Sequence, residues 1–287
     1  MSDTFLQGRR ALVTGSVQGI GLAMATELAR AGATVLLHGL PDAAVHAQAC
    51  AAVAAAGSGA VQSLDHNLAD PAAVDAMMDA VLADGPLDIL VNNAGIQHTA
   101  PLAEMPRARW DAILAVNLSA AFDTTRRALP GMVQRGYGRI VNIASVHGLV
   151  ASVNKAPYVA AKFGLVGLTR VTALEAAAAG NRGTGGVTAN CICPGWTETA
   201  IIEPQIVARA NAFGGDREAG IRDLLREKQP SGRTSLPSRD RPHRGLAVRT
   251  GRAQPHRRGH PHRRRVDRAV RTGHLRDLDQ RQVATRP

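Results

Sequence analysis

Short apolar runs alternate with longer alanine-rich stretches from residue 10 to about residue 193. This alternation is typical of a parallel β-sheet that helices cover on both faces. We predict strands at about residues 10–14, 33–38, 60–64, 87–91, 138–144 and 186–192. We predict helices at residues 19–31, 42–56, 71–83, 107–135 and 158–179, and we expect Pro130 to end or kink the fourth. The predicted fold is a single α/β domain with a doubly wound sheet.

The pattern changes abruptly after residue 230. The segment "SGRTSLPSRDRPHRGLAVRTGRAQPHRRGHPHRRRVDRAVRTGH" is rich in Arg, His, Pro and Gly and keeps no apolar period of 2 or 3.6. Such a segment buries too little surface to offset the entropy of ordering, so we predict a disordered tail. The expected organisation is a folded domain at 1–230 and a basic low-complexity tail at 231–287.

Charge follows the same division. The formal net charge is +11, but residues 1–230 carry 18 Lys and Arg against 19 Asp and Glu, whereas residues 231–287 carry 16 Arg against 4 Asp. The excess positive charge therefore gives no reason to expect a nucleic-acid-binding surface on the folded domain.

The remaining composition favours an ordinary cytoplasmic protein. The N-terminal residues do not resemble a secretory leader, and no run of about 18 uncharged apolar residues occurs, so we expect no membrane segment. Cys50, Cys191 and Cys193 lack the spacing of a zinc site or a disulfide framework, so we expect reduced thiols and no metal.

A glycine-rich stretch, "ALVTGSVQGIG", connects the first predicted strand to the first predicted helix. Gly15, Gly19 and Gly21 permit a tight turn and a close approach of backbone to a pyrophosphate at the helix N-terminus. Taken alone, a glycine-rich connection without a ligand is an alternative interpretation.

A second stretch, "SVHGLVASVNKAPYVAAK", holds one of the two tyrosines and two of the three lysines of the chain. Tyr158 and Lys162 are four residues apart on a predicted helix and share one face. A neighbouring ammonium favours the phenolate, so we expect Lys162 to lower the pKa of Tyr158. Ser145 follows the fifth predicted strand, at the sheet edge where ligands bind. A surface Tyr–Lys pair is the alternative.

Together with "LVNNAG" at residues 90–95, these two motifs resemble the short-chain dehydrogenase/reductase family. The resemblance implies a Rossmann-type fold with Tyr158 as general acid/base and Lys162 as the residue that binds ribose and lowers the tyrosine pKa. It also implies that Ser145 polarises the carbonyl and that Asn117 in "AVNLSAAF" supports a proton relay. The implied cofactor-binding residues are Gly15, Gly19, Ile20, Gly21, Leu40, Asn67, Leu68, Asn93, Ala94, Gly95, Tyr158, Lys162, Pro194 and Gly195.

The choice of cofactor depends on the residues after the second strand. An acidic residue there binds the ribose hydroxyls of NAD, and an arginine accommodates the phosphate of NADP. This chain has His38, Gly39 and Leu40. The absence of a basic side chain favours NAD.

Five further residues resemble the 3-hydroxybutyrate dehydrogenase branch of the family: Gln97, His147, Lys155, Trp196 and Gln205. Lys155 and the polar side chains suit a small carboxylate, and Trp196 suits an apolar wall. The resemblance implies reversible hydride transfer between NAD and (R)-3-hydroxybutyrate. Singly, each residue also has an ordinary structural interpretation, and a reductase of another small carbonyl compound is an alternative.

The resemblance extends from about residue 7 to residue 230. The family continues into a helix and a seventh strand that close the sheet and build a homotetramer, and residues 231–287 show neither. We hypothesise that this segment is an out-of-frame translation of a GC-rich gene, which would leave a defective relative or an enzyme that tolerates the change. A genuine basic arm that binds nucleic acid or an acidic partner is the competing hypothesis.

Overall fold

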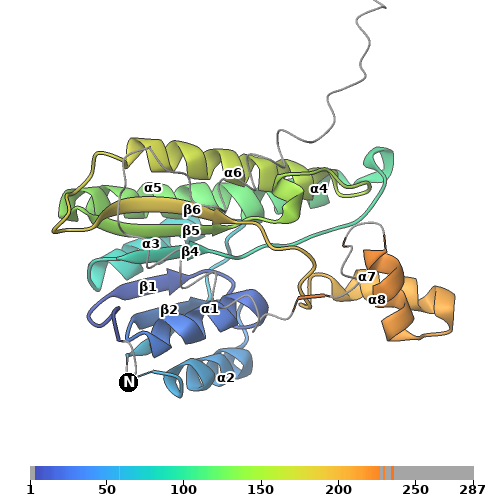
Figure 1. Ribbon diagram of the computed structural model, residues 1–287, viewed down its shortest axis with the longest axis horizontal. Helices are drawn as coiled ribbons and strands as arrows, with labels where there is room; N and C mark the ends of the chain where they lie inside the picture. Colours follow the sequence, from blue (N-terminus) through green and yellow to red (C-terminus); the bar gives the residue numbers. More distant parts are fainter. Residues whose placement is uncertain (1–3, 58, 227–228, 230–233, 236–287) are drawn as a thin grey trace, which may run out of the picture. The chain divides into compact units, whose positions relative to one another are not determined.

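The computed structural model describes residues 4–57, 59–226, 229 and 234–235. Figure 1 shows a parallel sheet between two layers of helices. The sheet has six strands in the order β3-β2-β1-β4-β5-β6. The strands are β1 (Arg10–Val13), β2 (Thr34–His38), β3 (Val61–Leu64), β4 (Ile89–Asn92), β5 (Tyr137–Ile143) and β6 (Gly186–Ile192). The predicted fold class is confirmed, and each of the six predicted strands is present.

Alternation along the strands divides the core into two layers. Ala11 and Val13 of β1 pack with α1 (Gly19–Arg30) and α2 (Ala43–Ala54) on one face. Leu12, between them, packs on the other face with α3 (Pro71–Ala83) and α5 (Ala120–Arg135). Because successive side chains point to opposite faces, continuous aliphatic runs are what a sheet covered on both sides requires.

The helices begin and end at residues that favour those positions. Asp42 caps α2 by accepting a hydrogen bond from the Val45 nitrogen, and Asp70 caps α3, where Pro71 takes the first turn. Gly136 ends α5 with a φ of 65°. The predicted helices at 19–31, 42–56 and 71–83 agree with α1, α2 and α3 within about two residues.

The predicted helix at 107–135 differs from the structure. It consists of α4 (Arg107–Leu114), a π turn η2 (Ala115–Ser119) and α5. Pro130 lies inside α5 and does not end it. Pro130 has no backbone N–H group to donate, but it lies on the exposed side of α5. Water can therefore donate to the carbonyl group that this N–H would otherwise have bonded. The fifth predicted helix, 158–179, is α6 (Ala156–Glu175), which begins two residues earlier because Pro157 suits its first turn.

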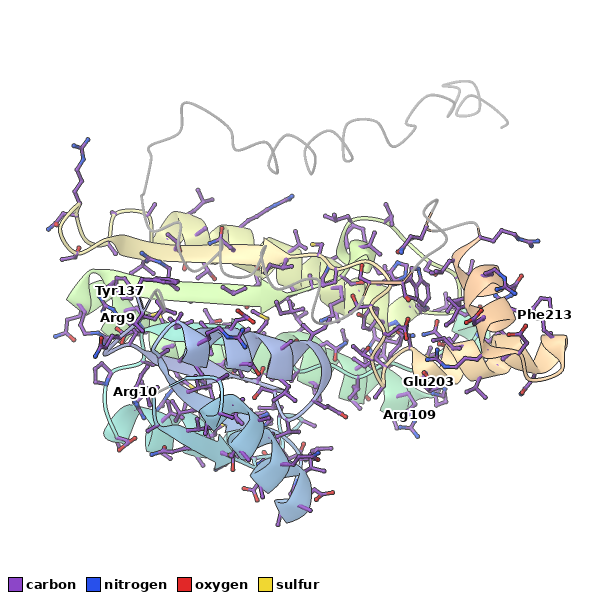
Figure 2. All side chains as sticks on the ribbon, turned by 60° about the horizontal axis from the view of Figure 1, so that its bottom comes forward. Arg9, Arg10, Arg109, Tyr137, Glu203 and Phe213 are labelled. Carbon is purple, nitrogen blue, oxygen red and sulfur yellow. The ribbon has the colours of Figure 1, made fainter. Side chains whose placement is uncertain are left out.

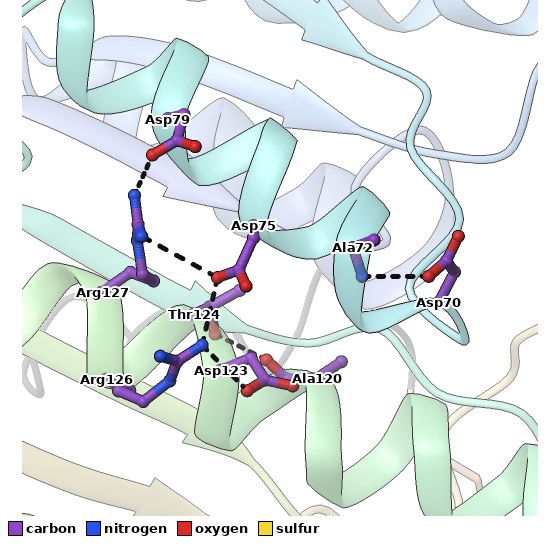
Figure 3. Close-up of polar contacts among 9 residues, drawn as sticks. All are labelled: Asp70, Ala72, Asp75, Asp79, Ala120, Asp123, Thr124, Arg126 and Arg127. Carbon is purple, nitrogen blue, oxygen red and sulfur yellow. Dashed lines mark hydrogen bonds and ion pairs between the residues drawn. The ribbon is translucent and has the colours of Figure 1, made fainter.

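Ion pairs join α3 to α5 on the surface (Figure 3). Arg126 lies 3.1 Å from Asp75, and Arg127 contacts both Asp75 and Asp79. Exposed ion pairs of this kind add little stability individually. At the start of β5, Tyr137 lies beside Arg9 (Figure 2), whose guanidinium is 3.7 Å from the ring centroid. The buried Arg139 approaches the same ring to 4.4 Å.

Two further helices, which were not among those predicted, follow β6. They are α7 (Glu203–Ala210) and α8 (Arg217–Leu225), with a short η4 (Asn211–Phe213) between them. Their apolar side chains, Ile202, Ile206, Leu224 and Leu225, form a separate small cluster with Trp196. Figure 1 shows both helices beyond the carboxyl ends of the strands.

The chain near residue 235 returns to the segment after β6. Ser235 forms a parallel bridge with Thr197, and its backbone nitrogen donates to the Trp196 carbonyl over 2.7 Å. Otherwise the predicted tail lies outside the described residues. Among the helices that the structure describes, none is long and apolar enough to span a membrane.

Candidate functional site

The sheet order places the candidate site between β1 and β4. The chain leaves β1 toward α1 on one face, and it leaves β4 toward the helices of the other face. At such a switch point a crevice opens at the carboxyl ends of the strands, where ligands bind in open α/β sheets. The glycine turn, the "NNAG" segment and the segment after β6 all begin at this edge.

Close packing explains two of the three glycines in the turn. Gly15 has a φ of 59°, and a Cβ there would lie 2.7 Å from the Ala94 Cα atom. A Cβ on Gly21 would collide with the Gly15 carbonyl and the Asn93 amide. Gly19, with a φ of 58°, opens α1, and only Thr199 lies near the Cβ position.

The N-terminus of α1 is suited to an anion. Its N-cap residue, Gln18, makes no side-chain capping bond, and the first turn holds no acidic residue. The first backbone N–H groups of a helix carry partial positive charge and lack partners within the helix. The turn and helix together therefore fit the pyrophosphate of a dinucleotide.

Thr14 and Asn93 fix the turn against the end of β4. Thr14 Oγ1 accepts from the backbone nitrogens of Asn93 and Ala94, over 3.0 and 3.1 Å. The Asn93 amide donates to the carbonyls of Thr14 and Gly15. Sequence analysis missed Thr14, although its position directly before Gly15 was a usable signal.

The predicted adenosine-side residues differ in exposure. Leu40 follows β2 and is 70% exposed. Asn67 is exposed and accepts from the Ala69 nitrogen in a local turn, whereas the Leu68 side chain is buried in the core. Ile20, the second residue of α1, is partly buried and packs against the core.

The predicted catalytic residues lie together. Tyr158 and Lys162 are both buried on α6, and the Lys162 Nζ atom is 5.6 Å from the tyrosine ring centroid. Ser145 lies beside Tyr158, and its Oγ accepts from the His147 nitrogen over 3.1 Å. Lys162 donates to the Ile143 carbonyl over 2.8 Å. The alternative of a surface Tyr–Lys pair is excluded by this burial.

The pKa of Tyr158 is raised, and not lowered as we expected from the neighbouring Lys162. Burial raises the pKa of Tyr158, and the hydrogen bond with Ser145 only partly opposes this. Burial also lowers the pKa of Lys162 to about 8, against the attraction of the nearby Cys191 and Cys193. Desolvation disfavours both charged forms, and this outweighs the attraction that the sequence suggested.

Asn117 is buried in the π turn. Its Oδ1 accepts from the Ile96 nitrogen over 2.8 Å, and its Nδ2 donates to the Ile96 carbonyl over 3.0 Å. The side chain thus fixes the segment beside Gly95, where a Cβ would approach both Asn117 and Lys162. Its role in a proton relay stays a prediction.

Three of the five predicted substrate residues form a series of contacts that begins at Tyr158. The His147 ring meets Tyr158 and Trp196 edge-on, with centroids 6.4 Å apart in each case. Lys155, which is 4% exposed, places its Nζ 4.5 Å from the Trp196 ring centroid. Residues from α6, η3 (Val146–Gly148) and the segment after β6 therefore form one buried group.

The two glutamines differ. Gln205 lies on α7, and its Nε2 is buried without a hydrogen-bond partner in the described part of the chain. A buried donor of this kind is costly unless a ligand accepts from it. Gln97 donates weakly to Thr99 over 3.5 Å, and no hydrogen bond joins it to the other four within the described ranges.

The segment after β6 completes the site. The Pro194 carbonyl accepts from the Val146 nitrogen over 2.9 Å, which ties this segment to the Ser145 loop. A Cβ on Gly195 would lie 3.1 Å from Gln229 Oε1. Pro194 and Gly195, which were both predicted to bind the cofactor, thus lie between the catalytic residues and the predicted substrate residues.

A buried polar network supports the site from below, and sequence analysis missed it. Asn92 on β4 donates to Asn142 on β5 over 2.9 Å and accepts from Thr124 over 2.7 Å. Asn142 donates to Thr169 on α6 over 2.8 Å. An asparagine at the same register on two buried strands was the available signal, since Asn92 pairs with Asn142.

Cysteines and metals add little to the site. Cys50, Cys191 and Cys193 are free thiols. In the described residues, no three His, Cys, Asp or Glu side chains are grouped to hold a metal ion.

Comparison with known proteins decides the family. Residues 9–208 match the short chain dehydrogenase family. The chain belongs to the short-chain dehydrogenase/reductase family. Its members are oxidoreductases that use a nicotinamide cofactor, and the glycine turn described above fits such a group.

Individual relatives of this family narrow the comparison. The chain is 50% identical to D-beta-hydroxybutyrate dehydrogenase of Cupriavidus necator over 81% of its length and 87% of that protein. It is 44% identical to the enzyme of the same name from Rhizobium meliloti, over 78% and 84% of the two chains. A putative NAD(P)-dependent gluconate 5-dehydrogenase from Beutenbergia cavernae, solved with NADP, has a TM-score of 0.72 at 35% identity and covers 86% and 92%.

Proposed function

We propose that this protein is a 3-hydroxybutyrate dehydrogenase that interconverts (R)-3-hydroxybutyrate and acetoacetate with NAD. The observation that carries the proposal is the buried group of Ser145, Tyr158, His147, Trp196 and Lys155. It joins an acid/base residue to a cation and an apolar wall within one site. The two D-beta-hydroxybutyrate dehydrogenases that are 50% and 44% identical to this chain support the same substrate class.

The residues of this chain handle the proton in the reaction. In the oxidation, Tyr158 first passes its own proton to the relay that Asn117 supports, and the phenolate Oη then takes the proton of the substrate hydroxyl as a hydride leaves the same carbon atom. Ser145 holds the reacting oxygen beside the Tyr158 hydroxyl. In the reduction, Tyr158 returns the proton, and its raised pKa keeps it protonated for that task. Bound NAD supplies the hydride acceptor, and Lys162 is placed to hold its ribose.

Lys155 gives the site its preference for a carboxylate. Its ammonium is buried beside Trp196, where a carboxylate would restore the solvation that burial removes. Gln205 adds a buried donor whose partner is absent among the described residues. His147 lies between Trp196 and Tyr158 and contacts both rings edge-on.

We propose NAD in preference to NADP. His38 ends β2, Gly39 and Leu40 follow it, and these residues place no cationic side chain where the additional phosphate of NADP would lie. The His38 Nδ1 atom accepts from Gly15, so this nitrogen carries no proton. A nicotinamide cofactor and free thiols are compatible with a cytoplasmic enzyme, which we also propose.

The test is NADH formation by the purified 287-residue chain with (R)-3-hydroxybutyrate. The S enantiomer, NADP and a series of short hydroxy acids serve as controls. Turnover with the R enantiomer and NAD is expected. Comparable turnover of another hydroxy acid would favour a different reductase of this family, and a folded chain without any turnover would favour a defective relative.

The family resemblance implies a homotetramer, and we propose that copies associate through α5 and α6. Phe122 on α5 and Phe163, Val171 and Leu174 on α6 are exposed. Exposed apolar side chains on adjacent helices are typical of an association surface. Light scattering after gel filtration is expected to give a multiple of 30.1 kDa. A monomer at micromolar concentration would contradict this proposal.

A further inference from the structure

His38, the last residue of β2, binds the glycine turn at several points. Its Nδ1 accepts from the Gly15 backbone nitrogen over 3.2 Å, and its Nε2 lies 2.8 Å from the His66 carbonyl oxygen. Its own backbone N–H donates to Ser16 Oγ, and its carbonyl accepts from the Ser16 nitrogen over 2.7 Å. One residue therefore joins β2, the glycine turn and the loop that carries Asn67.

These contacts assign the protonation state of the ring. A nitrogen that accepts from an amide N–H carries no proton, so Nε2 carries the hydrogen and donates to the His66 carbonyl. A cationic imidazole would present N–H groups on both sides. The Gly15 N–H would then face another donor, and the contact between His38 and the turn would be lost.

The surroundings of His38 also favour the neutral ring. The residue is 3% exposed. Burial lowers the pKa of His38, while its hydrogen bond to the His66 carbonyl opposes this. Of the charged or titratable groups that face it, His66 and His46 lower the pKa of His38 further, and Asp65 raises it.

We propose that His38 is a positioning residue for cofactor binding. Its neutral imidazole holds the Gly15 backbone, and thereby the turn that carries the dinucleotide phosphates, in the conformation that binds. Protonation of the ring releases the turn and weakens nucleotide binding. The proposal rests on the proposed nicotinamide-dependent function and adds a residue and a pH response to it.

The direction of the pH response follows from the bond pattern. The acceptor at Nδ1 is present above the pKa of His38 and is lost as the pH falls through it. That pKa lies below the ordinary histidine value of about 6.5. The Kd for NADH is therefore expected to be constant above about pH 7 and to rise in more acidic solution.

Three substitutions distinguish the contact at Nδ1 of the His38 ring from the contact at Nε2. His38→Asn places an oxygen near the Nδ1 position, keeps an acceptor for Gly15 and cannot become cationic. His38→Gln places its polar group near Nε2 and leaves the Gly15 N–H without an acceptor. His38→Leu removes both contacts. His46→Asn is the matched control, since this second buried imidazole contacts the Leu40 carbonyl and not the turn.

The measurement is the Kd of NADH by fluorescence titration of the full chain between about pH 5.5 and 8.5, with thermal unfolding as a check on folding. At about pH 8, His38→Gln and His38→Leu are expected to raise the Kd about tenfold, because each leaves a buried donor unpaired. His38→Asn is expected to stay within about threefold of the wild type and to lose the acidic rise. His46→Asn is expected to keep that rise.

In turnover assays, His38→Gln and His38→Leu are expected to raise the KM for NAD with little change in kcat, because the residue does not touch the reacting atoms. A purely structural role would instead lower stability without separating the Asn and Gln variants. Equal Kd values for these two variants, or a wild-type acidic rise in His38→Asn, would overturn the proposal.

The binding assay is independent of the substrate. Normal NADH binding without oxidation of 3-hydroxybutyrate would overturn the proposed substrate and leave the His38 comparison valid. A wild-type chain that binds neither NADH nor NADPH would overturn both proposals.

Discussion

The cofactor side and the substrate side of the site are held in different ways. On the cofactor side, the glycine turn is fixed by buried hydrogen bonds from Thr14, Asn93 and His38. On the substrate side, α7 and α8 pack through a small apolar cluster around Trp196. Directional bonds allow one arrangement, whereas a small apolar cluster tolerates displacement at lower cost. The difference predicts which substitutions affect the fold and which affect only substrate binding.

Tyr158 lies where the two sides meet, so its removal is expected to have the largest effect. Tyr158→Phe deletes the acid/base group and should lower kcat by about 10²- to 10⁴-fold. Steady-state kinetics in both directions measures this. Tyr137→Phe is the matched control, because this tyrosine lies at the far end of the sheet, where its ring contacts Arg9 and Arg139. Equal losses in the two variants would refute the assignment.

Glycine substitutions compare the two sides directly. Gly15→Ala adds a Cβ 2.7 Å from the Ala94 Cα atom at a positive φ, and it should lower the free energy of unfolding by about 2–4 kcal/mol and abolish nucleotide binding. Gly214→Ala, between α7 and α8, has a similar φ of 65° but open space around it. It should cost only about 1–2 kcal/mol and leave nucleotide binding intact. Urea unfolding and NADH titration test both.

Lys155→Met tests the substrate side alone. Loss of the buried ammonium should raise the KM for 3-hydroxybutyrate by about 10- to 100-fold, since a charge-assisted hydrogen bond contributes about 1.5–3 kcal/mol. The KM for NAD and the unfolding midpoint should change little. Lys155→Arg keeps the charge and should recover part of the loss. A rise in both KM values would show that the two sides are not independent.

The pH dependence of stability tests the burial of Lys162. Its folded pKa is lowered to about 8 from 10.5, so the folded state binds fewer protons than the unfolded state between these values. The free energy of unfolding should therefore rise with pH across this window, by at most about 1.4 kcal/mol per pH unit, and stay nearly constant below about pH 8, where Lys162 is protonated in both states. Urea unfolding of Lys162→Met should show a smaller slope. An unchanged slope would assign the titration to another group.

Local sequence signals predicted most of the fold. Aliphatic runs located β1, β2 and β4 because these strands are buried on both faces, whereas the edge strand β3 is partly exposed. Asp70 with Pro71 marked the start of α3. The π turn at Ala115–Ser119 was not predictable, since its residues have no distinctive propensity and the Asn117–Ile96 bonds support it. The helices α7 and α8 were missed because their apolar positions are few and pack mainly around Trp196.

The site was predictable only where its residues are close in sequence. Tyr158 and Lys162 share a helix face, so their spacing sufficed. The hydrogen bond between Gly15 and His38 joins residues 23 positions apart, and no local sequence pattern predicts it. The pKa of Lys162 depends on burial by Ala161, Cys191 and other neighbours that only the folded chain assembles.

The π turn also sets the phase of the helix that contains it. Each residue of an α-helix advances the side-chain direction by about 100°, so an additional residue turns everything that follows. Ile113, before the turn, packs against Tyr158, whereas Thr124, after it, reaches Asn92 under the sheet. Deletion of one residue within 115–119 would restore an unbroken helix. That unbroken helix could then contact either Tyr158 or Asn92, but not both.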